Sequence, residues 1–229
     1  MQAVILAGGL GTRMRPATLT TPKSLLPVAG RPFLHWQLKR IAECGYDDVV
    51  VLAGYLGEQV EAFVGDGSQW GVRARVIQDG PTRLGTGGAL HDAMYALDDH
   101  FLVTYGDSYL PFPFNYETPH LILRAYSDCD AVMALYENAG RWQKSNAATD
   151  GEWVLNYDKE ADGDEFRFID YGVIAMCRKV LMDFPMRSLS TIQSKLAELH
   201  RMRALVVRLP FYEIGSPDGL RDLEAYFSP

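Results

Sequence analysis

The chain has 229 residues with a net charge of −7, from 29 acidic and 22 basic residues, and 48% of its residues are hydrophobic. The hydrophobic share is enough for a buried core, whereas the acidic balance argues against general binding to nucleic acids or anionic membranes, which requires a basic field. If this chain binds phosphates, we expect it to use a few focused cations together with a divalent metal.

The chain shows no sign of export or of a membrane anchor. Its three cysteines, Cys44, Cys129 and Cys177, fit neither a zinc pattern nor a disulfide framework, so we expect them to be small buried apolar residues. No apolar stretch approaches about 18 residues, and no basic and apolar regions of a signal peptide are visible at the N-terminus. These features predict a protein of the reducing cytoplasm.

The first half of the chain alternates short apolar runs with helical patterns. The runs are bounded by glycines or polar residues, as strands are, and Leu34, Leu38 and Ile41 recur at helical spacing after Pro32. Strands are predicted over residues 2–7, 47–53, 72–78 and 101–107, and helices over residues 32–44, 57–64 and 86–97. This alternation predicts an α/β core with a mostly parallel sheet covered on both faces.

The pattern loosens after residue 110. Strands are predicted near residues 130–136, 152–157, 166–176 and 203–208, and helices near residues 189–200 and 216–227. Since no repeat or low-complexity linker interrupts the chain, we expect one domain over residues 1–229, with a substrate-binding elaboration in its second half.

A glycine loop, LAGGLGTRMRP (residues 6–16), follows the first predicted strand. It is not a dinucleotide-binding turn, because Met14 replaces the third glycine of G-x-G-x-x-G and no acid follows near residue 30. A Walker A loop is also excluded, because Lys23 lacks the preceding glycine. What remains is either a surface turn or a loop whose N–H groups approach a phosphate, with Arg13 and Arg15 as fixed charges beside it.

The next stretch, TTPKSLLPVAGRP (residues 20–32), places Lys23 on a backbone that its prolines hold extended. Together the two stretches resemble the signature of the sugar-1-phosphate nucleotidyltransferases, also called NDP-sugar pyrophosphorylases. The resemblance implies a Rossmann-like three-layer α/β/α fold with a mostly parallel central sheet. It further implies a nucleotide-binding half of about residues 1–110 and a sugar-phosphate-binding half of about residues 111–229. It also leads us to expect no C-terminal β-helix of the kind that some members carry.

Three further stretches extend the resemblance at the nucleotide end. IQDGPTRLGTGGAL (residues 77–90) resembles the base-recognition segment, in which the amide of Gln78 could both donate to and accept from a base edge, although an exposed glutamine is the plain alternative. In TYGDSYL (residues 104–110), Asp107 resembles the aspartate that binds the metal, and in FYEIGSPDGL (residues 211–220), Glu213 stands where the family has a second metal-binding aspartate. The nucleotide-binding residues implied are Leu6, Ala7, Gly8, Gly9, Gly11, Thr12, Gln78, Gly85, Thr86 and Gly106.

The sugar end carries weaker signals. Lys159, in NYDKEADG (residues 156–163), resembles the lysine that holds the sugar phosphate. Asp170 and Tyr171, in FIDYGVIAM (residues 168–176), resemble the strand that lines the sugar, and Asn146 is a further candidate. Acid–lysine pairs and Asp-Tyr pairs are also common on surfaces and hairpins, so an ordinary structural role remains the alternative for these residues.

The resemblance implies that a sugar 1-phosphate attacks the α-phosphorus of a nucleoside triphosphate and releases pyrophosphate. Arg13 would bind the β- and γ-phosphates, Lys23 would stabilise the transition state, and Asp107 and Glu213 would hold Mg²⁺. The short branch that includes heptose 1-phosphate guanylyltransferases of surface polysaccharide synthesis is the most similar, which favours GTP.

Several alternatives stay open at this point. Uridylyl or thymidylyl transfer to a hexose 1-phosphate is one, a non-catalytic NDP-sugar-binding regulator is another, and a Rossmann oxidoreductase is the weakest. Association into a homo-oligomer is left open.

Overall fold

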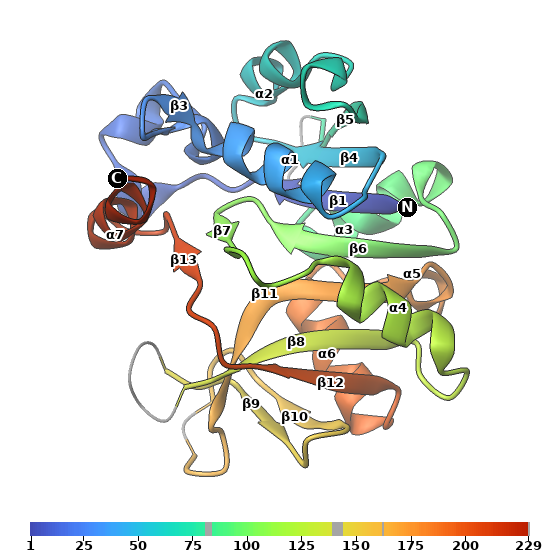
Figure 1. The fold of residues 1–229 in the computed structure, drawn as a ribbon. Coiled ribbons are helices and arrows are strands. Elements are labelled where there is room, and N and C mark those ends of the chain that lie inside the picture. The colour runs from blue at the N-terminus through green and yellow to red at the C-terminus, as the bar shows by residue number, and fades with distance from the viewer. Residues whose placement is uncertain (81–83, 139–143, 162, 229) are drawn as a thin grey trace. The chain divides into compact units, whose positions relative to one another are not determined.

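The structure of the chain is a computed structural model that describes residues 1–80, 84–138, 144–161 and 163–228. It comprises two compact units (Figure 1). The first unit contains Met1–Arg83, Thr104–Asn115 and Phe211–Pro229, and the second contains Leu84–Val103 and Tyr116–Pro210. These units are interleaved along the chain, unlike the two consecutive halves expected from the sequence.

The first unit contains a parallel ladder of three strands, β1 (Gln2–Ala7), β4 (Asp48–Ala53) and β5 (Arg73–Gln78). Helices α1 (Phe33–Glu43) and α2 (Gly57–Val64) connect them. Every residue of β4 is buried, as is typical of a parallel strand covered on both faces. In the register of the ladder, Ala7 pairs with Ala53 and Ala53 pairs with Gln78, so the three strands end side by side.

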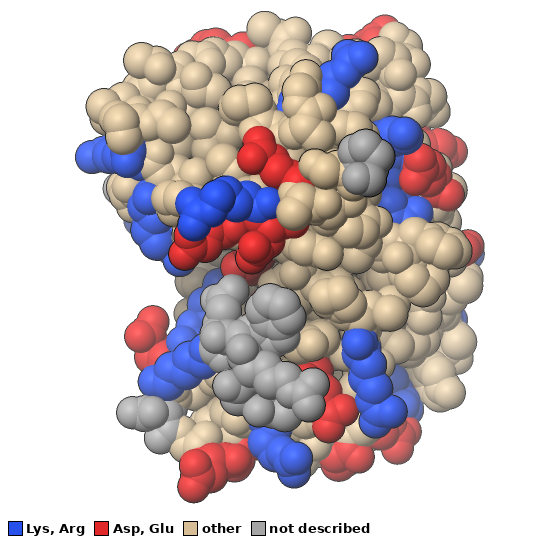
Figure 2. All heavy atoms as spheres, turned by 60° about the vertical axis from the view of Figure 1, so that its left-hand side comes forward, with Lys and Arg blue, Asp and Glu red and all other residues tan. Residues whose placement is uncertain are grey.

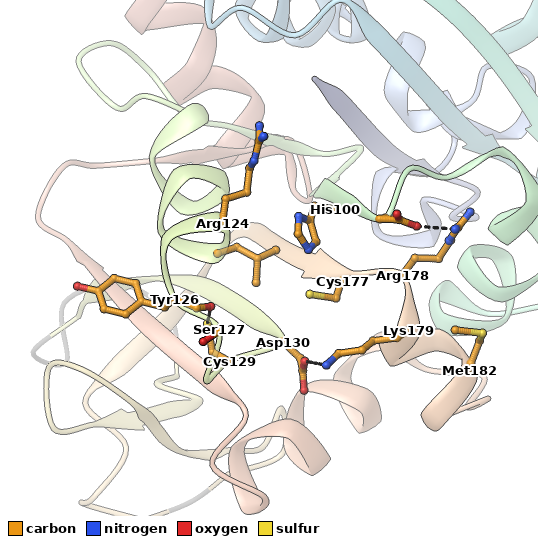
Figure 3. Close-up of a pocket in the computed structure, with 12 residues that line it drawn as sticks. His100, Arg124, Tyr126, Ser127, Cys129, Asp130, Cys177, Arg178, Lys179 and Met182 are labelled. Carbon is orange, nitrogen blue, oxygen red and sulfur yellow. Dashed lines mark hydrogen bonds and ion pairs between the residues drawn. The ribbon is translucent and has the colours of Figure 1, made fainter.

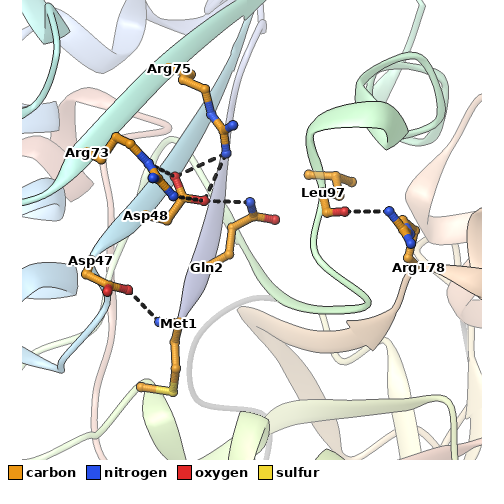
Figure 4. A network of polar contacts seen from close by, with 8 residues as sticks. All are labelled: Met1, Gln2, Asp47, Asp48, Arg73, Arg75, Leu97 and Arg178. Atoms are coloured by element: carbon orange, nitrogen blue, oxygen red, sulfur yellow. Dashed lines mark hydrogen bonds and ion pairs between the residues drawn. The ribbon is translucent and has the colours of Figure 1, made fainter.

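Buried Asp48 joins the beginnings of the same three strands (Figure 4). Its carboxylate accepts hydrogen bonds from Gln2 Nε2 at 2.9 Å and from Arg75 Nη2 at 2.9 and 3.1 Å, and it also contacts Arg73. Burial by itself would raise the pKa of Asp48, but the hydrogen bonds from Gln2 and Arg73 and the charge of Arg75 hold this pKa below its usual value. The polar network thus closes one end of the ladder and leaves the other end for loops.

The C-terminal segment returns to the first unit because its apolar residues complete a core there. Strand β13 (Tyr212–Glu213) pairs with β7 (Ser108–Tyr109), and α7 (Pro217–Phe227) packs near the hairpin of β2 (Pro27–Val28) and β3 (Arg31–Pro32). The indole of Trp36 stacks on Phe227 with ring centroids 4.2 Å apart. The buried members of this core are Val28, Phe33, Tyr109, Ile214 and Leu223.

The second unit is built on a mixed sheet. Strand β8 (Ala131–Glu137) is antiparallel to β11 (Phe168–Cys177) and parallel to β12 (Met202–Val207), and β9 (Ala147–Thr149) is antiparallel to β11 and to β10 (Val154–Tyr157). A bridge between Trp153 and Arg203 brings β12 back toward β10, so the sheet curls on itself. Its helices are α3 (Thr86–Asp92), α4 (Glu117–Ala125), α5 (Lys179–Asp183) and α6 (Leu189–Glu198).

Strand β6 (His100–Tyr105) runs from the second unit into the first, since the division falls after Val103. The remaining elements are single turns of 3₁₀-helix, over Thr12–Met14, Ala17–Leu19, Lys23–Leu25, Ser68–Trp70 and Ala93–Ala96.

Every strand and helix predicted in the first half of the chain is present, which confirms the α/β prediction. Two of them are shorter than expected: the helix from Thr86 gives way to a 3₁₀ turn at Ala93, and the strand from His100 ends at Tyr105, before the turn that carries Asp107. Helix α4, which the sequence analysis did not predict, has no side-chain hydrogen bond at its N-cap Tyr116, so the sequence carries no capping signal for its start.

Surface features agree with the composition. Basic and acidic side chains lie beside one another on the face drawn in Figure 2, as a chain with both charge types in similar number predicts. Among the described residues, no helix is long and apolar enough to cross a bilayer. The three cysteines are buried thiols, as predicted.

Candidate active site

Lys23 and Asp107 form an ion pair in the first unit, although they are 84 residues apart in the sequence. The Nζ of Lys23 donates a short hydrogen bond to Oδ2 of Asp107, and the two side chains retain 17% and 24% of their accessible surface. Lys23 begins a 3₁₀ turn directly after Pro22, whose φ of −63° and ψ of 146° are those of extended backbone. The two charges therefore lie together, partly shielded but open to a ligand.

The turn that carries Asp107 is held from three directions. Gly106 N donates to the carbonyl of Leu6 at 2.9 Å, and a Cβ on Gly106 would lie 2.6 Å from that oxygen, so this close approach requires glycine. The buried amide of Gln37 donates to the carbonyls of Tyr105 at 2.8 Å and Ser108 at 2.7 Å. On the third side, the N–H of Ile214 donates to the carbonyl of Asp107 at 2.9 Å.

The segment that contains Ile214 also places Glu213 beside this turn, and Arg13 lies against the same segment. Glu213 pairs with Ser108 in the β13–β7 register, so it lies one residue along from Asp107 on the neighbouring strand. A Cβ on buried Gly215 would lie 3.1 Å from Nη2 of Arg13, which places this guanidinium directly against the segment after Glu213. Two cations and two carboxylates from four separate stretches are thus gathered in one unit.

The glycine loop is shaped by Thr18. Gly11 has a φ of +59°, and its carbonyl accepts a hydrogen bond of 2.8 Å from Oγ1 of Thr18, which is 1% exposed. A Cβ on Gly11 would lie 2.9 Å from Cγ2 of Thr18 and 3.1 Å from Cβ of Lys23. Thr18 therefore fixes the glycine loop against the residue that presents the lysine.

In the nucleotidyltransferase reaction that the resemblance implies, replacing Thr18 with valine should raise the KM for the nucleotide about 10-fold. The isosteric side chain keeps the packing but removes the hydroxyl donor from the carbonyl of Gly11, which still accepts a hydrogen bond from Met14 N at 2.9 Å. The KM for the sugar phosphate should change much less, since the resemblance assigns this loop to the nucleotide. Steady-state kinetics with each substrate varied in turn measures both constants. Thr18→Ser, which keeps the hydroxyl, serves as the control and should restore the nucleotide KM. Equal changes in both KM values would contradict a positioning role.

At the end of β5, the neighbouring side chains of Gln78 and Asp79 lie on different sides of the strand. The exposed side chain of Gln78 lies against α2, where Nε2 donates to Glu61 Oε2 at 2.5 Å and Oε1 lies 2.9 Å from the position of a Cβ on Gly57. Asp79 instead brings its Oδ2 to 3.0 Å and 3.5 Å from the Cβ positions of Gly54 and Gly8. Of the two, Asp79 is the one beside the glycine loop.

Asp107 and Glu213 suit a magnesium ion by donor type. Mg²⁺ takes oxygen ligands and usually keeps waters and substrate phosphate oxygens beside one or two carboxylates. Two carboxylates at adjacent positions, Asp107 in the turn before β7 and Glu213 on the paired strand β13, match this need. Within the described ranges no group of three or more His, Cys, Asp or Glu side chains gathers as a metal cluster. The residues present therefore fit Mg²⁺ that is shared with a substrate.

In the second unit, the predicted base-contacting turn packs on another loop. A Cβ on Gly85, whose φ is +79°, would lie 2.5 Å from the carbonyl oxygen of Arg187, and a Cβ on Gly87 would lie 2.3 Å from that of Met186. Thr86 Oγ1 accepts a hydrogen bond from Leu189 N at 2.9 Å. Within this unit, these glycines are required by the close passage of that loop. Residues 81–83 of the same predicted segment lie outside the described residues.

The predicted sugar-end residues lie near one another in the second unit. Oδ1 of Asn146 accepts from Asp170 N, and the carbonyl of Asn146 accepts from Asp158 N, both at 2.9 Å, so Asn146 links Asp170 to the turn that carries exposed Lys159. The carboxylate of Asp170 is 7% exposed and accepts from Gly172 N at 2.9 Å and Tyr157 Oη at 3.2 Å.

Tyr171 is fully buried in this unit. Its hydroxyl donates to the carbonyl of Pro210 at 3.2 Å, and burial, with a smaller effect of Tyr136, raises its pKa above the usual value. Lys159 is therefore the exposed charged member of the predicted sugar end, whereas Asp170 and Tyr171 are engaged within the fold.

The second unit also contains a cavity of about 440 Å³ between α4, α5 and the ends of β6, β8 and β11 (Figure 3). Its lining carries charges that are already paired, Lys179 with Asp130 at 2.5 Å and Arg178 with Asp99 at 2.5 Å. Burial and the charge of Asp130 raise the pKa of Cys177, which also lines it, to about 11. None of the residues predicted for the sugar end is part of this lining.

Three residues of the first unit were not identified from the sequence. Thr18 and Gln37 act on backbone carbonyls, which a sequence does not show, and Asp79 stood beside a glutamine that matched the family pattern better. A signal for Asp79 existed: it directly follows a predicted strand of a parallel sheet, where ligands bind.

The comparisons with known proteins agree on the family. The family model of the MobA-like NTP transferase domain matches residues 3–208. The chain is 44% identical over 108 residues to N-acetylmuramate alpha-1-phosphate uridylyltransferase of Neisseria meningitidis and 43% identical over 109 residues to mannose-1-phosphate guanylyltransferase of Mycobacterium tuberculosis. Each match covers 47% of this chain, and the matches cover 47% and 30% of those relatives, so the chain spans half or less of the curated relatives it matches.

The fold is similar to that of HddC from Yersinia pseudotuberculosis, with a TM-score of 0.80, 22% identity and 99% of each chain covered. A complex of HddC with GMP-PN gives a TM-score of 0.79 at 23% identity, again over 99% of each chain. This likeness confirms the predicted Rossmann-like nucleotidyltransferase fold. Because the family model covers most of the chain, the protein belongs to the MobA-like NTP transferase domain family.

Proposed function

We propose that this protein is a sugar-1-phosphate nucleotidyltransferase that makes an NDP-sugar and releases pyrophosphate. The observation that carries the proposal is the Lys23–Asp107 pair, with Arg13 and Glu213 beside it and the glycine loop next to it. The family membership and the names of the relatives support the same reaction class.

In this reaction a phosphate oxygen of the sugar 1-phosphate forms a bond to the α-phosphorus, and the bond from that phosphorus to the bridging oxygen of pyrophosphate breaks. The attacking oxygen is already ionised near neutral pH, so no general base is needed. Two anions have to approach each other, so positioning and charge stabilisation supply most of the catalysis.

The residues of the first unit divide these tasks. Lys23 neutralises charge on the α-phosphoryl group, and Arg13 with its planar fork of donors binds the β- and γ-phosphates. Asp107 and Glu213 would hold Mg²⁺, which when bound withdraws charge from the phosphate oxygens. Lys159, on the second unit, would orient the sugar phosphate.

GTP and D-glycero-D-manno-heptose 1-phosphate are the substrates that we favour, with GDP-heptose for surface polysaccharide synthesis as the product. The sequence resemblance to the heptose guanylyltransferase branch supports this choice, and so does the occurrence of a GMP-PN complex for a protein of the same fold. One relative is named a uridylyltransferase and another a guanylyltransferase, so uridylyl transfer is the second candidate.

A substrate panel tests the proposal. The full chain with Mg²⁺ is incubated with each common nucleoside triphosphate and with hexose and heptose 1-phosphates, and pyrophosphate release and NDP-sugar mass are measured. We expect release to require both substrates and to be fastest with GTP and the heptose phosphate. Tight binding of an NDP-sugar with no pyrophosphate from any pair would instead identify a non-catalytic regulator.

A further inference from the structure

Two adjacent side chains at the end of β5 could read a nucleotide base, and the structure separates them. Asp79 N donates to the carbonyl of Ala53 at 2.9 Å, so the backbone still follows β4 at Asp79, one residue past the end of β5. Side chains that follow one another in a strand point to opposite faces. Gln78 accordingly lies against Glu61 and Gly57 of α2, whereas Asp79 lies on the other side.

The position of the Asp79 carboxylate is set by two glycines. Gly8 follows β1 and Gly54 follows β4, and a Cβ on Gly54 would lie 3.0 Å from the carbonyl oxygen of Gly8 and 3.0 Å from Oδ2 of Asp79. A Cβ at Gly54 would therefore crowd both the carbonyl of Gly8 and the carboxylate of Asp79. The half-buried carboxylate is thus held over the glycine loop at the carboxyl ends of three parallel strands, where ligands of α/β sheets bind.

We propose that Asp79, rather than Gln78, selects the base, and that the base it selects is guanine. An ionised carboxylate only accepts hydrogen bonds and can accept two side by side. Guanine presents two adjacent donors, its N1–H and its 2-amino group. Uracil and thymine present a single N–H between two carbonyls, which the carboxylate repels, and adenine and cytosine each set an acceptor beside their amino group.

This inference rests on the proposed function, since it assumes that a nucleotide occupies the site of the first unit. It refines that function by giving a physical reason for GTP among relatives whose names cover both uridylyl and guanylyl transfer. It also predicts that the 2-amino group matters, because this group supplies the second donor to the carboxylate.

Calorimetric titration of the full chain with GTP, ITP and UTP tests the inference without a sugar substrate. ITP keeps N1–H but lacks the 2-amino group, so wild-type protein should bind GTP about 10-fold more tightly than ITP and about 10- to 100-fold more tightly than UTP. Asp79→Asn replaces one acceptor by a donor with little change in shape. It should reduce the GTP-to-UTP affinity ratio at least about 10-fold and bring GTP and ITP close together.

Glu58→Gln makes the same acid-to-amide change on the exposed face of α2 and should leave both ratios as in wild type. Gln78→Ala tests the competing possibility that Gln78 selects the base. The inference is overturned if Asp79→Asn leaves the ratios unchanged, if Gln78→Ala changes them instead, or if wild-type protein prefers UTP. The comparison of GTP with ITP on wild-type protein needs no variant, so it tests the preference for guanine even if Asp79→Asn fails to fold, and Gln78→Ala then tests whether the other side chain is responsible.

Failure of the proposed function has a different signature. In that case no pair of substrates yields pyrophosphate, whatever base the protein binds. Pyrophosphate production with an unaltered base preference in Asp79→Asn would leave the function standing and remove Asp79 from base selection.

Discussion

Lys23→Ala is expected to lower the turnover number for NDP-sugar synthesis by about 10² or more, the scale of losing one preorganised charge contact in a transition state. The side chain of Lys23 is 17% exposed and is already held by Asp107 before substrate arrives, so little reorganisation is needed when charge develops on the α-phosphoryl group. Pyrophosphate release under saturating substrates measures the effect.

The control for this loss is Lys39→Ala. Lys39 lies on α1 of the same unit and retains 54% of its side-chain surface, so its removal changes the net charge equally without touching the site. Turnover of that variant should stay near the wild-type value. Near-normal synthesis by Lys23→Ala, with intact thermal unfolding, would exclude Lys23 from the mechanism.

Asp107→Ala is expected to lower the turnover number by a similar factor of about 10² or more. It should also raise the Mg²⁺ concentration needed for the half-maximal rate. The ion pair with Lys23 is partly exposed and contributes little to folding, so stability should fall only slightly. A Mg²⁺ titration of the rate, with thermal unfolding alongside, separates loss of the metal ligand from loss of the fold.

Asp218→Asn is the matched control, since this acid lies in the first turn of α7 and its side chain is 81% exposed. Its Mg²⁺ requirement should equal that of wild type. An unchanged turnover and Mg²⁺ requirement for Asp107→Ala would show that another group holds the metal, and Glu213→Gln would then be the variant to titrate.

Local patterns predicted the elements of the first half well because those elements are long and regular. The apolar run over residues 2–7 is β1, and the helical spacing of Leu34, Leu38 and Ile41 belongs to α1. Prediction was poorer where an element depends on its surroundings. Helix α4 has only nine residues and no capping side chain, and β9 contains only three residues, so packing rather than propensity decides both.

The candidate site divides in the same way. The glycine loop, Arg13 and Lys23 were identified because they form short contiguous motifs whose chemistry is evident from residue type. The roles of Gln78 and Asp79 could not be assigned from the sequence, because a shift of one residue along a strand moves a side chain to the opposite face. The structure places Asp79, and not Gln78, beside Gly8 and Gly54.

Residue types and their immediate neighbours are enough to identify the reactive groups of this protein and those that lie on turns after apolar strands, because these properties depend on a few adjacent residues. The contact of Lys23 with Asp107, and the return of the last segment that brings Glu213 beside them, emerge from the folded chain alone. Such long-range contacts arise from burial shared between distant elements. Here that burial is the core in which Ile214 and Leu223 pack with Phe33 and Tyr109.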